Sequence, residues 1–135
     1  MDFSAERSRI LVVDDEPANL KVMREVLAKT YRMSFAKSGD AALALIEKEL
    51  PKLILLDIMM PNMNGFDVCK AVKSNPATAH IPIIFVTALG DESDEFKGFE
   101  LGAVDYITKP ISPAIVRARV KTQLSLVQAE QLKQA

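Results

Sequence analysis

The sequence contains no tryptophan, one cysteine, one histidine and only five glycines among its 135 residues. A lone cysteine, Cys69, excludes an internal disulfide, and His80 has no second histidine or cysteine nearby with which to bind zinc. No apolar run approaches the length of a membrane span, and the segment MDFSAERSRI contains no apolar signal sequence. We therefore expect a cytoplasmic protein from a reducing compartment, with no membrane partner.

Neither sign of charge dominates, because 17 Lys and Arg residues face 18 Asp and Glu residues. The resulting net charge of −1 gives no general attraction to nucleic acid, so we expect no direct nucleic-acid contact. Hydrophobic residues make up 49% of the chain, which is enough to bury the core of one compact domain without disulfides or structural metals.

Short apolar runs alternate with amphipathic stretches along the whole chain. The runs predict five buried strands, at residues 9–13, 33–36, 52–57, 82–87 and 104–108. Apolar residues at helical spacing follow each run and predict five helices, with Cys69 on the buried face of the third and Phe96 and Phe99 on that of the fourth. This alternation predicts an α/β fold: a flavodoxin-like, doubly wound, five-stranded parallel sheet of order 2-1-3-4-5.

The last helix begins at Ser112-Pro113 and has no visible stop before the end of the sequence. Its expected length exceeds what covering a sheet requires. We therefore predict one domain over residues 1–124 and a helical extension or linker over residues 125–135.

Polar residues follow four of the five predicted strands. Asp14-Asp15 follow the first strand, Asp57 ends the third, Thr87 ends the fourth and Lys109 follows the fifth. The carboxyl ends of parallel strands meet at one edge of a sheet, so these groups are predicted to converge. Crowded carboxylates repel one another, and a hard divalent cation such as Mg²⁺, which prefers oxygen ligands, relieves the repulsion.

The predicted cluster suits phosphoryl chemistry. The three aspartates and a backbone carbonyl near Met59 could supply the oxygen ligands of Mg²⁺. Asp57 is a feasible nucleophile toward a phosphoryl group, while Lys109 and Thr87 could stabilise the phosphoryl oxygens. Taken singly, each residue has a plainer explanation, such as a helix cap, a strand side chain or a solvated lysine. Their joint placement favours a shared site.

Four segments in order, ILVVDDE, LILLDIMMPNMNGF, PIIFVTA and GAVDYITKP, resemble the receiver domain of bacterial two-component response regulators. The resemblance runs from about residue 9 to about residue 124. It implies that Asp57 is the phosphoacceptor and that Asp14 and Asp15 are the acidic pair that holds Mg²⁺. It also implies a cis peptide bond between Lys109 and Pro110.

The resemblance further implies a conformational switch. A sensor histidine kinase or phosphotransfer protein would phosphorylate Asp57, and Thr87 and Lys109 would then move toward the phosphoryl group. Tyr106 matches the aromatic switch residue that turns inward as Thr87 moves. A changed surface would be recognised by a partner or by a second copy of the chain.

The segment ISPAIVRARVKTQLSL resembles receivers that are attached to cyclic-di-GMP cyclases or phosphodiesterases. This resemblance implies an output domain in cis. A receiver without an output domain, acting on a protein partner in trans or as a homodimer, remains an alternative.

Three other functions fit parts of the sequence. An aspartate-based phosphohydrolase would need a second acid two residues after its nucleophile, where this chain has Met59. A nucleotide-binding enzyme would need a glycine-rich first loop, whereas DDEPAN is acidic and lacks glycine. A phosphorylation-independent adaptor would not need the full set of acids. We therefore expect no enzyme activity beyond self-phosphorylation and slow self-dephosphorylation, since neither Met59 nor Leu89 can orient a water molecule.

Overall fold

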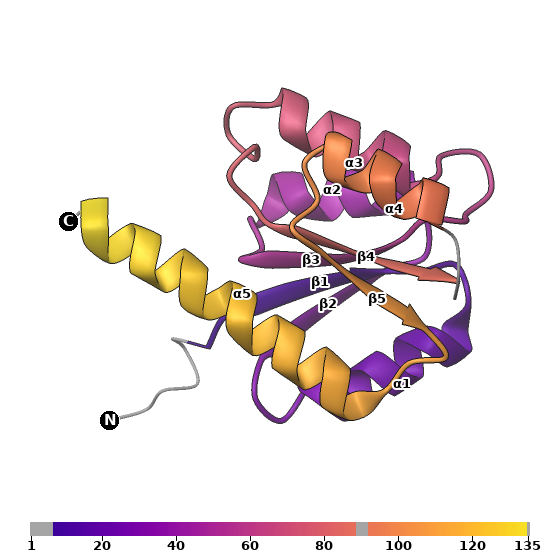
Figure 1. Ribbon diagram of the computed structural model, residues 1–135, viewed down its shortest axis with the longest axis horizontal. Helices are drawn as coiled ribbons and strands as arrows, with labels where there is room; N and C mark the ends of the chain where they lie inside the picture. The colour runs from indigo at the N-terminus through magenta and orange to yellow at the C-terminus, as the bar shows by residue number, and fades with distance from the viewer. Residues whose placement is uncertain (1–6, 89–91, 135) are drawn as a thin grey trace.

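The protein, described here from a computed structural model, is a three-layer α/β sandwich (Figure 1). The structure describes residues 7–88 and 92–134. Five strands and five helices alternate along the chain. They are β1 (Arg9–Val13), α1 (Pro17–Leu27), β2 (Arg32–Ala36), α2 (Gly39–Lys48), β3 (Leu53–Asp57), α3 (Gly65–Ser74), β4 (Ile83–Ala88), α4 (Glu92–Glu100), β5 (Asp105–Lys109) and α5 (Pro113–Gln134).

All five strands are parallel, and their order in the sheet is β2-β1-β3-β4-β5. This confirms the predicted fold class and strand order. The three central strands β1, β3 and β4 are almost wholly apolar and buried because helices cover both faces of the sheet, whereas the edge strands β2 and β5 contain polar and partly exposed residues. All five residues of β3 are buried, including the aspartate at its end.

Each face of the sheet has its own hydrophobic core. Helices α2, α3 and α4 cover one face, and α1 and α5 cover the other (Figure 1). Leu11, Ile54 and Phe85 belong to the first core, and Ile10, Leu55 and Ile84 belong to the second. Cys69 is fully buried in the first core, as predicted. Adjacent residues of a strand pack into opposite cores, because their side chains point to opposite faces of the sheet. This alternation fixes the register of the strands and so the positions of their ends.

Helix α4 contradicts one prediction from the sequence. Gly102 follows the helix with a positive φ of 107°, a conformation that favours glycine and ends a helix. The prediction that Phe96 and Phe99 are core residues is wrong, because their side chains are 67% and 53% exposed. Helical spacing identifies an apolar face but does not tell whether the domain itself covers that face.

Helix α5 continues well past the sheet and ends beyond the amino ends of the strands (Figure 1). The predicted extended last helix is therefore present as one continuous helix. The proposed boundary between residues 124 and 125 falls inside it and stays a prediction. None of the helices in the described part of the chain is long and apolar enough to cross a membrane.

The loop after β3 folds back tightly against its own strand. The backbone N–H of Gly65 donates to the carbonyl of Ile58 at 2.9 Å, and Asn62 adopts a positive φ of 67° within the turn. A Cβ at position 65 would overlap the carbonyl oxygen of Asp57 and lie 2.9 Å from the Cα of Ile58. Only glycine therefore allows this approach of backbone to backbone.

We expect Gly65→Ala to lower the free energy of unfolding by about 2–3 kcal/mol, because the crowded atoms belong to the backbone and cannot rotate away. Gly39→Ala is the comparison variant, since the three atoms nearest to a Cβ there belong to the Met63 side chain and not to the backbone, so we expect a smaller loss. Urea unfolding of both variants checks this. Equal losses in the two variants would contradict the role assigned to Gly65.

Candidate functional site

Three aspartates meet at the carboxyl edge of the sheet, as the strand order requires. Asp57 is the last residue of β3, and Asp14 and Asp15 directly follow β1, which pairs with β3. One carboxylate oxygen from each lies within 4.8 Å of the other two. Asp14 and Asp57 are only 3% and 2% exposed, whereas Asp15 is half-buried. The predicted convergence of the acids is therefore observed.

Lys109 extends from the end of β5 into this acidic cluster. Its Nζ lies 3.1 Å from Oδ1 of Asp57 and 3.6 Å from Oδ2 of Asp14. Burial lowers the pKa of Lys109, but the two carboxylates more than offset this effect, so the pKa is raised above its ordinary value. The ammonium group is thus a permanent positive charge beside both buried acids. The peptide bond between Lys109 and Pro110 is cis, as expected.

The charge balance at Asp57 is unfavourable despite Lys109. Burial, and then the negative charge of Asp14, raise the pKa of Asp57 from its ordinary value of 3.8 to about 6. The lysine acts in the opposite direction but does not cancel them. One cation facing three acids leaves surplus negative charge in a small volume, which is the arrangement that favours binding of a divalent cation.

The residues present fit Mg²⁺ by the chemistry of their donors. All three side chains offer hard carboxylate oxygens, and the cluster opens to solvent on the side of Asp15, where retained water ligands fit. Asp14 is also fixed in place, because its Oδ1 accepts a 2.9 Å hydrogen bond from the backbone N–H of Glu16. Neither Asp14 nor Asp15 is the N-cap of α1, since that position belongs to Glu16.

The remaining predicted residues lie close by along the strands. Thr87 is 3% exposed and follows Val86, which pairs with Asp57. Met59 lies two residues beyond Asp57 with a 73% exposed side chain, so its thioether faces solvent. Leu89 lies outside the described residues.

Tyr106 points into the domain. Its side chain is 7% exposed and contacts the rings of Phe85 and Phe99, with centroids 6.0 and 4.8 Å away. Its hydroxyl donates to the backbone carbonyls of Asp94, at 3.1 Å, and Glu95. Burial and the nearby negative charge of Glu95 raise its pKa to about 12.

The loop between β3 and α3 ends in a strong helix start. The side chain of Asn64 accepts from the N–H of Asp67 at 3.0 Å, and Asp67 accepts from the N–H of Asn64 at 3.1 Å. This capping box fixes where α3 begins and so limits the path of the loop after Asp57.

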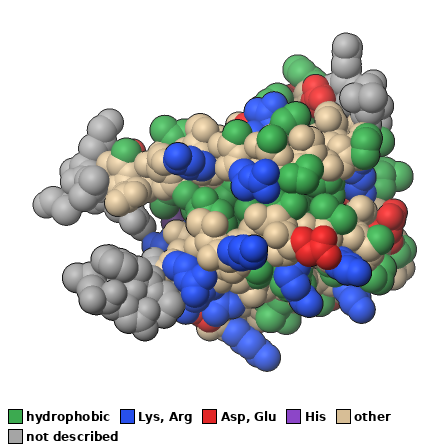
Figure 2. Space-filling view, turned by 90° about the horizontal axis from the view of Figure 1, so that it is seen from below, with side chains coloured by type: hydrophobic (Ala, Val, Ile, Leu, Met, Phe, Trp, Pro, Cys, Tyr) green, Lys and Arg blue, Asp and Glu red, His purple; other side chains and the backbone are tan. Residues whose placement is uncertain are grey.

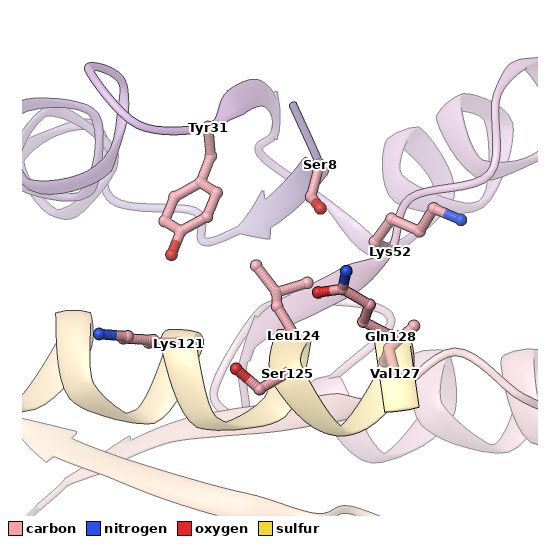
Figure 3. A pocket seen from close by; sticks show the side chains of 8 residues that line it. All are labelled: Ser8, Tyr31, Lys52, Lys121, Leu124, Ser125, Val127 and Gln128. Atoms are coloured by element: carbon pink, nitrogen blue, oxygen red, sulfur yellow. The ribbon is translucent and has the colours of Figure 1, made fainter. Parts of the chain in front are cut away.

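A separate cavity of about 460 Å³ lies near the amino ends of the strands, at the end of the sheet opposite to the acids (Figure 3). Side chains from α5, such as Leu124 and Gln128, face Tyr31 and Ser8 across it. Its lining contains two lysines but no acid cluster, and it lies far from Asp57 along the strands. The strand-end acids therefore remain the candidate functional site.

Comparison with known proteins agrees with the geometry. The sequence profile of the response regulator receiver domain matches residues 10–121. The chain belongs to this family. The solved structure of a CheY-like response regulator receiver domain protein from Methanospirillum hungatei superposes on this receiver domain with a TM-score of 0.85. That structure is 29% identical in sequence, and the match covers 92% of this chain and 98% of that one.

Two curated relatives are longer than this receiver domain. The chain is 48% identical over 115 residues to a Vibrio cholerae protein named "Probable cyclic di-GMP phosphodiesterase". The match covers 85% of this chain and 26% of the relative. The chain is 47% identical over 116 residues to response regulator PleD of Caulobacter vibrioides, again covering 85% and 26%. The receiver domain thus spans about a quarter of the length of these relatives.

Proposed function

We propose that this receiver domain is a magnesium-dependent phosphoryl switch in which Asp57 accepts the phosphoryl group. The observation that carries the proposal is the contact of Lys109 with Asp57 and Asp14 inside a cluster of three carboxylates. This arrangement has surplus negative charge where a cation would bind and one fixed positive charge where phosphoryl oxygens would lie. Receiver-family membership supports the same assignment.

In the proposed reaction, an Asp57 carboxylate oxygen attacks phosphorus. A P–O bond of the acyl phosphate forms, and the P–N bond of a phosphohistidine on a histidine kinase or phosphotransfer protein breaks. The leaving imidazole nitrogen takes the electron pair. Asp14, Asp15, Asp57 and the carbonyl of Met59 would hold Mg²⁺, which supplies charge neutralisation on the transferring group.

After transfer, we propose that the residues on β4 and β5 respond. The Lys109 ammonium exchanges its Asp57 oxygen for a phosphoryl oxygen. Thr87, buried next to Val86, donates its hydroxyl to another phosphoryl oxygen. Thr87 pairs with Thr108 on β5, and Tyr106 lies two residues before Thr108 on the same strand. Movement of Thr87 would therefore change the space available to the Tyr106 ring.

The experiment that tests the proposal is intact-mass measurement after incubation with acetyl phosphate. One phosphoryl adduct in Mg²⁺ buffer, and none with EDTA, is the expected result. An adduct that forms equally well in EDTA would contradict the role of the metal. No adduct, with Mg²⁺ shown to bind, would contradict the proposed switch and favour the phosphorylation-independent adaptor alternative.

The acyl phosphate is expected to persist for many minutes rather than seconds. The exposed Met59 side chain next to Asp57 cannot hydrogen-bond an attacking water molecule. We expect Met59→Asn to shorten the lifetime several-fold because an amide can orient that water, and Met59→Leu, the apolar control, to leave it unchanged. Decay of the adduct by intact mass measures both. A wild-type half-life of seconds would contradict this assignment.

Two surfaces are proposed for partners. Lys and Arg side chains gather over the face formed by α1 and α5 (Figure 2), where Lys21, Arg24, Arg117 and Lys121 are all exposed. This basic face suits an acidic docking surface on the phosphodonor protein. The exposed Phe96 and Phe99 on α4 form an apolar surface that fits an output partner or a second copy of the domain.

We also propose that the output lies in cis, in a cyclic-di-GMP enzyme. This rests on the name of the Vibrio cholerae relative, of which the matched part is 26%, and on α5, which projects past the sheet. Cyclic-di-GMP hydrolysis or synthesis by the whole protein, compared with and without acetyl phosphate, tests this proposal. A receiver acting in trans would leave that activity absent.

A further inference from the structure

Helix α4 contains a glycine in its middle where alanine would ordinarily be more stable. Gly98 is buried within α4 and has no positive φ, so its backbone conformation gives no reason for glycine. The neighbourhood of Gly98 does give one. An added Cβ would overlap the hydroxyl of Tyr106 and lie 2.7 Å from Cδ2 of Phe85. The hydroxyl end of the Tyr106 side chain thus occupies the space that a side chain at position 98 would fill.

The contacts of Tyr106 show how closely the ring depends on this space. Its hydroxyl reaches the carbonyls of Asp94 and Glu95, one turn before Gly98 on the same helix. Phe85 and Phe99 contact the ring from two sides. The hydroxyl can reach those carbonyls only where α4 has no side chain in the way, and within the described residues that position is Gly98.

We propose that Gly98 is a positioning residue: it forms the socket that holds Tyr106 in its inward position and so sets the balance between the two positions of the proposed switch. The effect on the switch rests on the proposed function, whereas the packing of Tyr106 against Gly98 does not. A methyl group at position 98 would displace the ring without touching the acidic cluster or Lys109.

A second place for the ring exists next to the first. A groove of about 260 Å³ lies beside Tyr106 between α4 and α5, lined by Phe99, Thr108, Ile115 and Arg119. The ion pair of Arg119 with Asp105, at 3.1 Å, lies along this groove. A Tyr106 ring that leaves the socket at Gly98 turns into this groove, where it becomes more exposed and changes the surface around Phe99.

The test is ¹⁹F NMR of the chain labelled with 3-fluorotyrosine, with the resonance of Tyr31 assigned through Tyr31→Phe. We expect Gly98→Ala to move the Tyr106 resonance toward the position of solvent-exposed fluorotyrosine. Gly39→Ala is the matched control, because the three atoms nearest to a Cβ there belong to Met63 and not to Tyr106 or Phe85, so it should leave the resonance unmoved. A Tyr106 resonance unchanged by Gly98→Ala would overturn the proposal.

A thermal measurement guards against a general effect on folding. Gly98→Ala should lower the melting temperature with Tyr106 present and lower it less, or raise it, in the Tyr106→Ala background, because the overlapping hydroxyl is gone. Equal changes in both backgrounds would contradict the socket.

Failure of the proposed function is seen separately, as a wild-type chain that takes up no phosphoryl group from acetyl phosphate. In that case the role of Gly98 in a phosphoryl-driven switch is overturned even if the resonance moves. Phosphoryl uptake by the wild type, together with a moved resonance in Gly98→Ala, supports both.

Discussion

The Asp57→Asn variant is expected to take up no phosphoryl group from acetyl phosphate in Mg²⁺ buffer, while the wild-type chain takes up one. The amide lacks the carboxylate oxygen that attacks phosphorus, and it removes one charge from the cluster that would hold the cation. Asp14 is comparably buried but already accepts the N–H of Glu16, so it is poorly placed to substitute. Intact mass of the two proteins checks the prediction.

Asp40→Asn is the matched control, because Asp40 is an exposed aspartate in the first turn of α2. This variant should take up one phosphoryl group, as the wild type does. Lys109→Ala should retain Asp57 but slow uptake by roughly a hundredfold or more, since it removes the positive charge that stabilises the phosphoryl oxygens. An adduct on Asp57→Asn equal to that on the wild type would place the phosphoacceptor elsewhere.

In magnesium-free buffer at pH 7.5, Asp57→Asn is expected to be more stable than the wild type by about 1–3 kcal/mol. The native fold raises the pKa of Asp57 to about 6 through burial and repulsion by Asp14. At neutral pH the folded wild type must therefore carry a charge that the fold disfavours. An asparagine of similar shape removes that charge while its amide oxygen can still accept from Lys109.

The sign of the pH dependence follows from the raised pKa. The stability contributed by the protonated Asp57 carboxyl is fully present below 3.8 and is lost as the pH rises through about 6. The advantage of Asp57→Asn should therefore be smaller at pH 5 than at pH 7.5. Urea unfolding at the two pH values checks this, and an advantage that grows toward acid would contradict it.

Magnesium should reverse this order. At a concentration 100 times its dissociation constant, a cation that binds only the folded state adds about 2.7 kcal/mol of stability. The wild type should gain this stabilisation, whereas Asp57→Asn should gain much less because it has lost one charged ligand. Equal stabilisation of both would show that Asp57 is not a ligand.

Much of the fold could be predicted from the sequence because its physical signals are local. Uninterrupted apolar runs such as residues 53–56 of β3 indicate strands covered on both faces, and the alternation with helices implies parallel strands. Parallel strands in turn place Asp14, Asp57 and Lys109 at one edge. The convergence of the site is therefore a consequence of the fold.

The features that could not be predicted depend on tertiary contacts. The exposure of Phe96 and Phe99 is decided by where α4 lies on the sheet, and helical spacing is the same for a covered and an uncovered face. The buried state of Asp14 and the half-buried state of Asp15 likewise depend on how the first loop turns into α1.

Gly98 shows the same limit more sharply. In the sequence it is one glycine in a helical pattern, with no turn or cap signal beside it. The structural role of Gly98 depends on Tyr106, which lies on the next strand and contacts α4 only in the folded domain. The one available signal is negative: a glycine in a helix interior without a local reason indicates close packing.

The position of the phosphoryl group can be located chemically, which decides whether Asp57 is the phosphoacceptor. The wild-type chain is treated with acetyl phosphate and Mg²⁺, the acyl phosphate is reduced with borohydride, and the peptides are sequenced by mass spectrometry. Reduction converts a phosphorylated aspartate into homoserine, so we expect homoserine at position 57 and aspartate at positions 14 and 15. Homoserine at either of those positions, or at none of the three, would contradict the proposed switch.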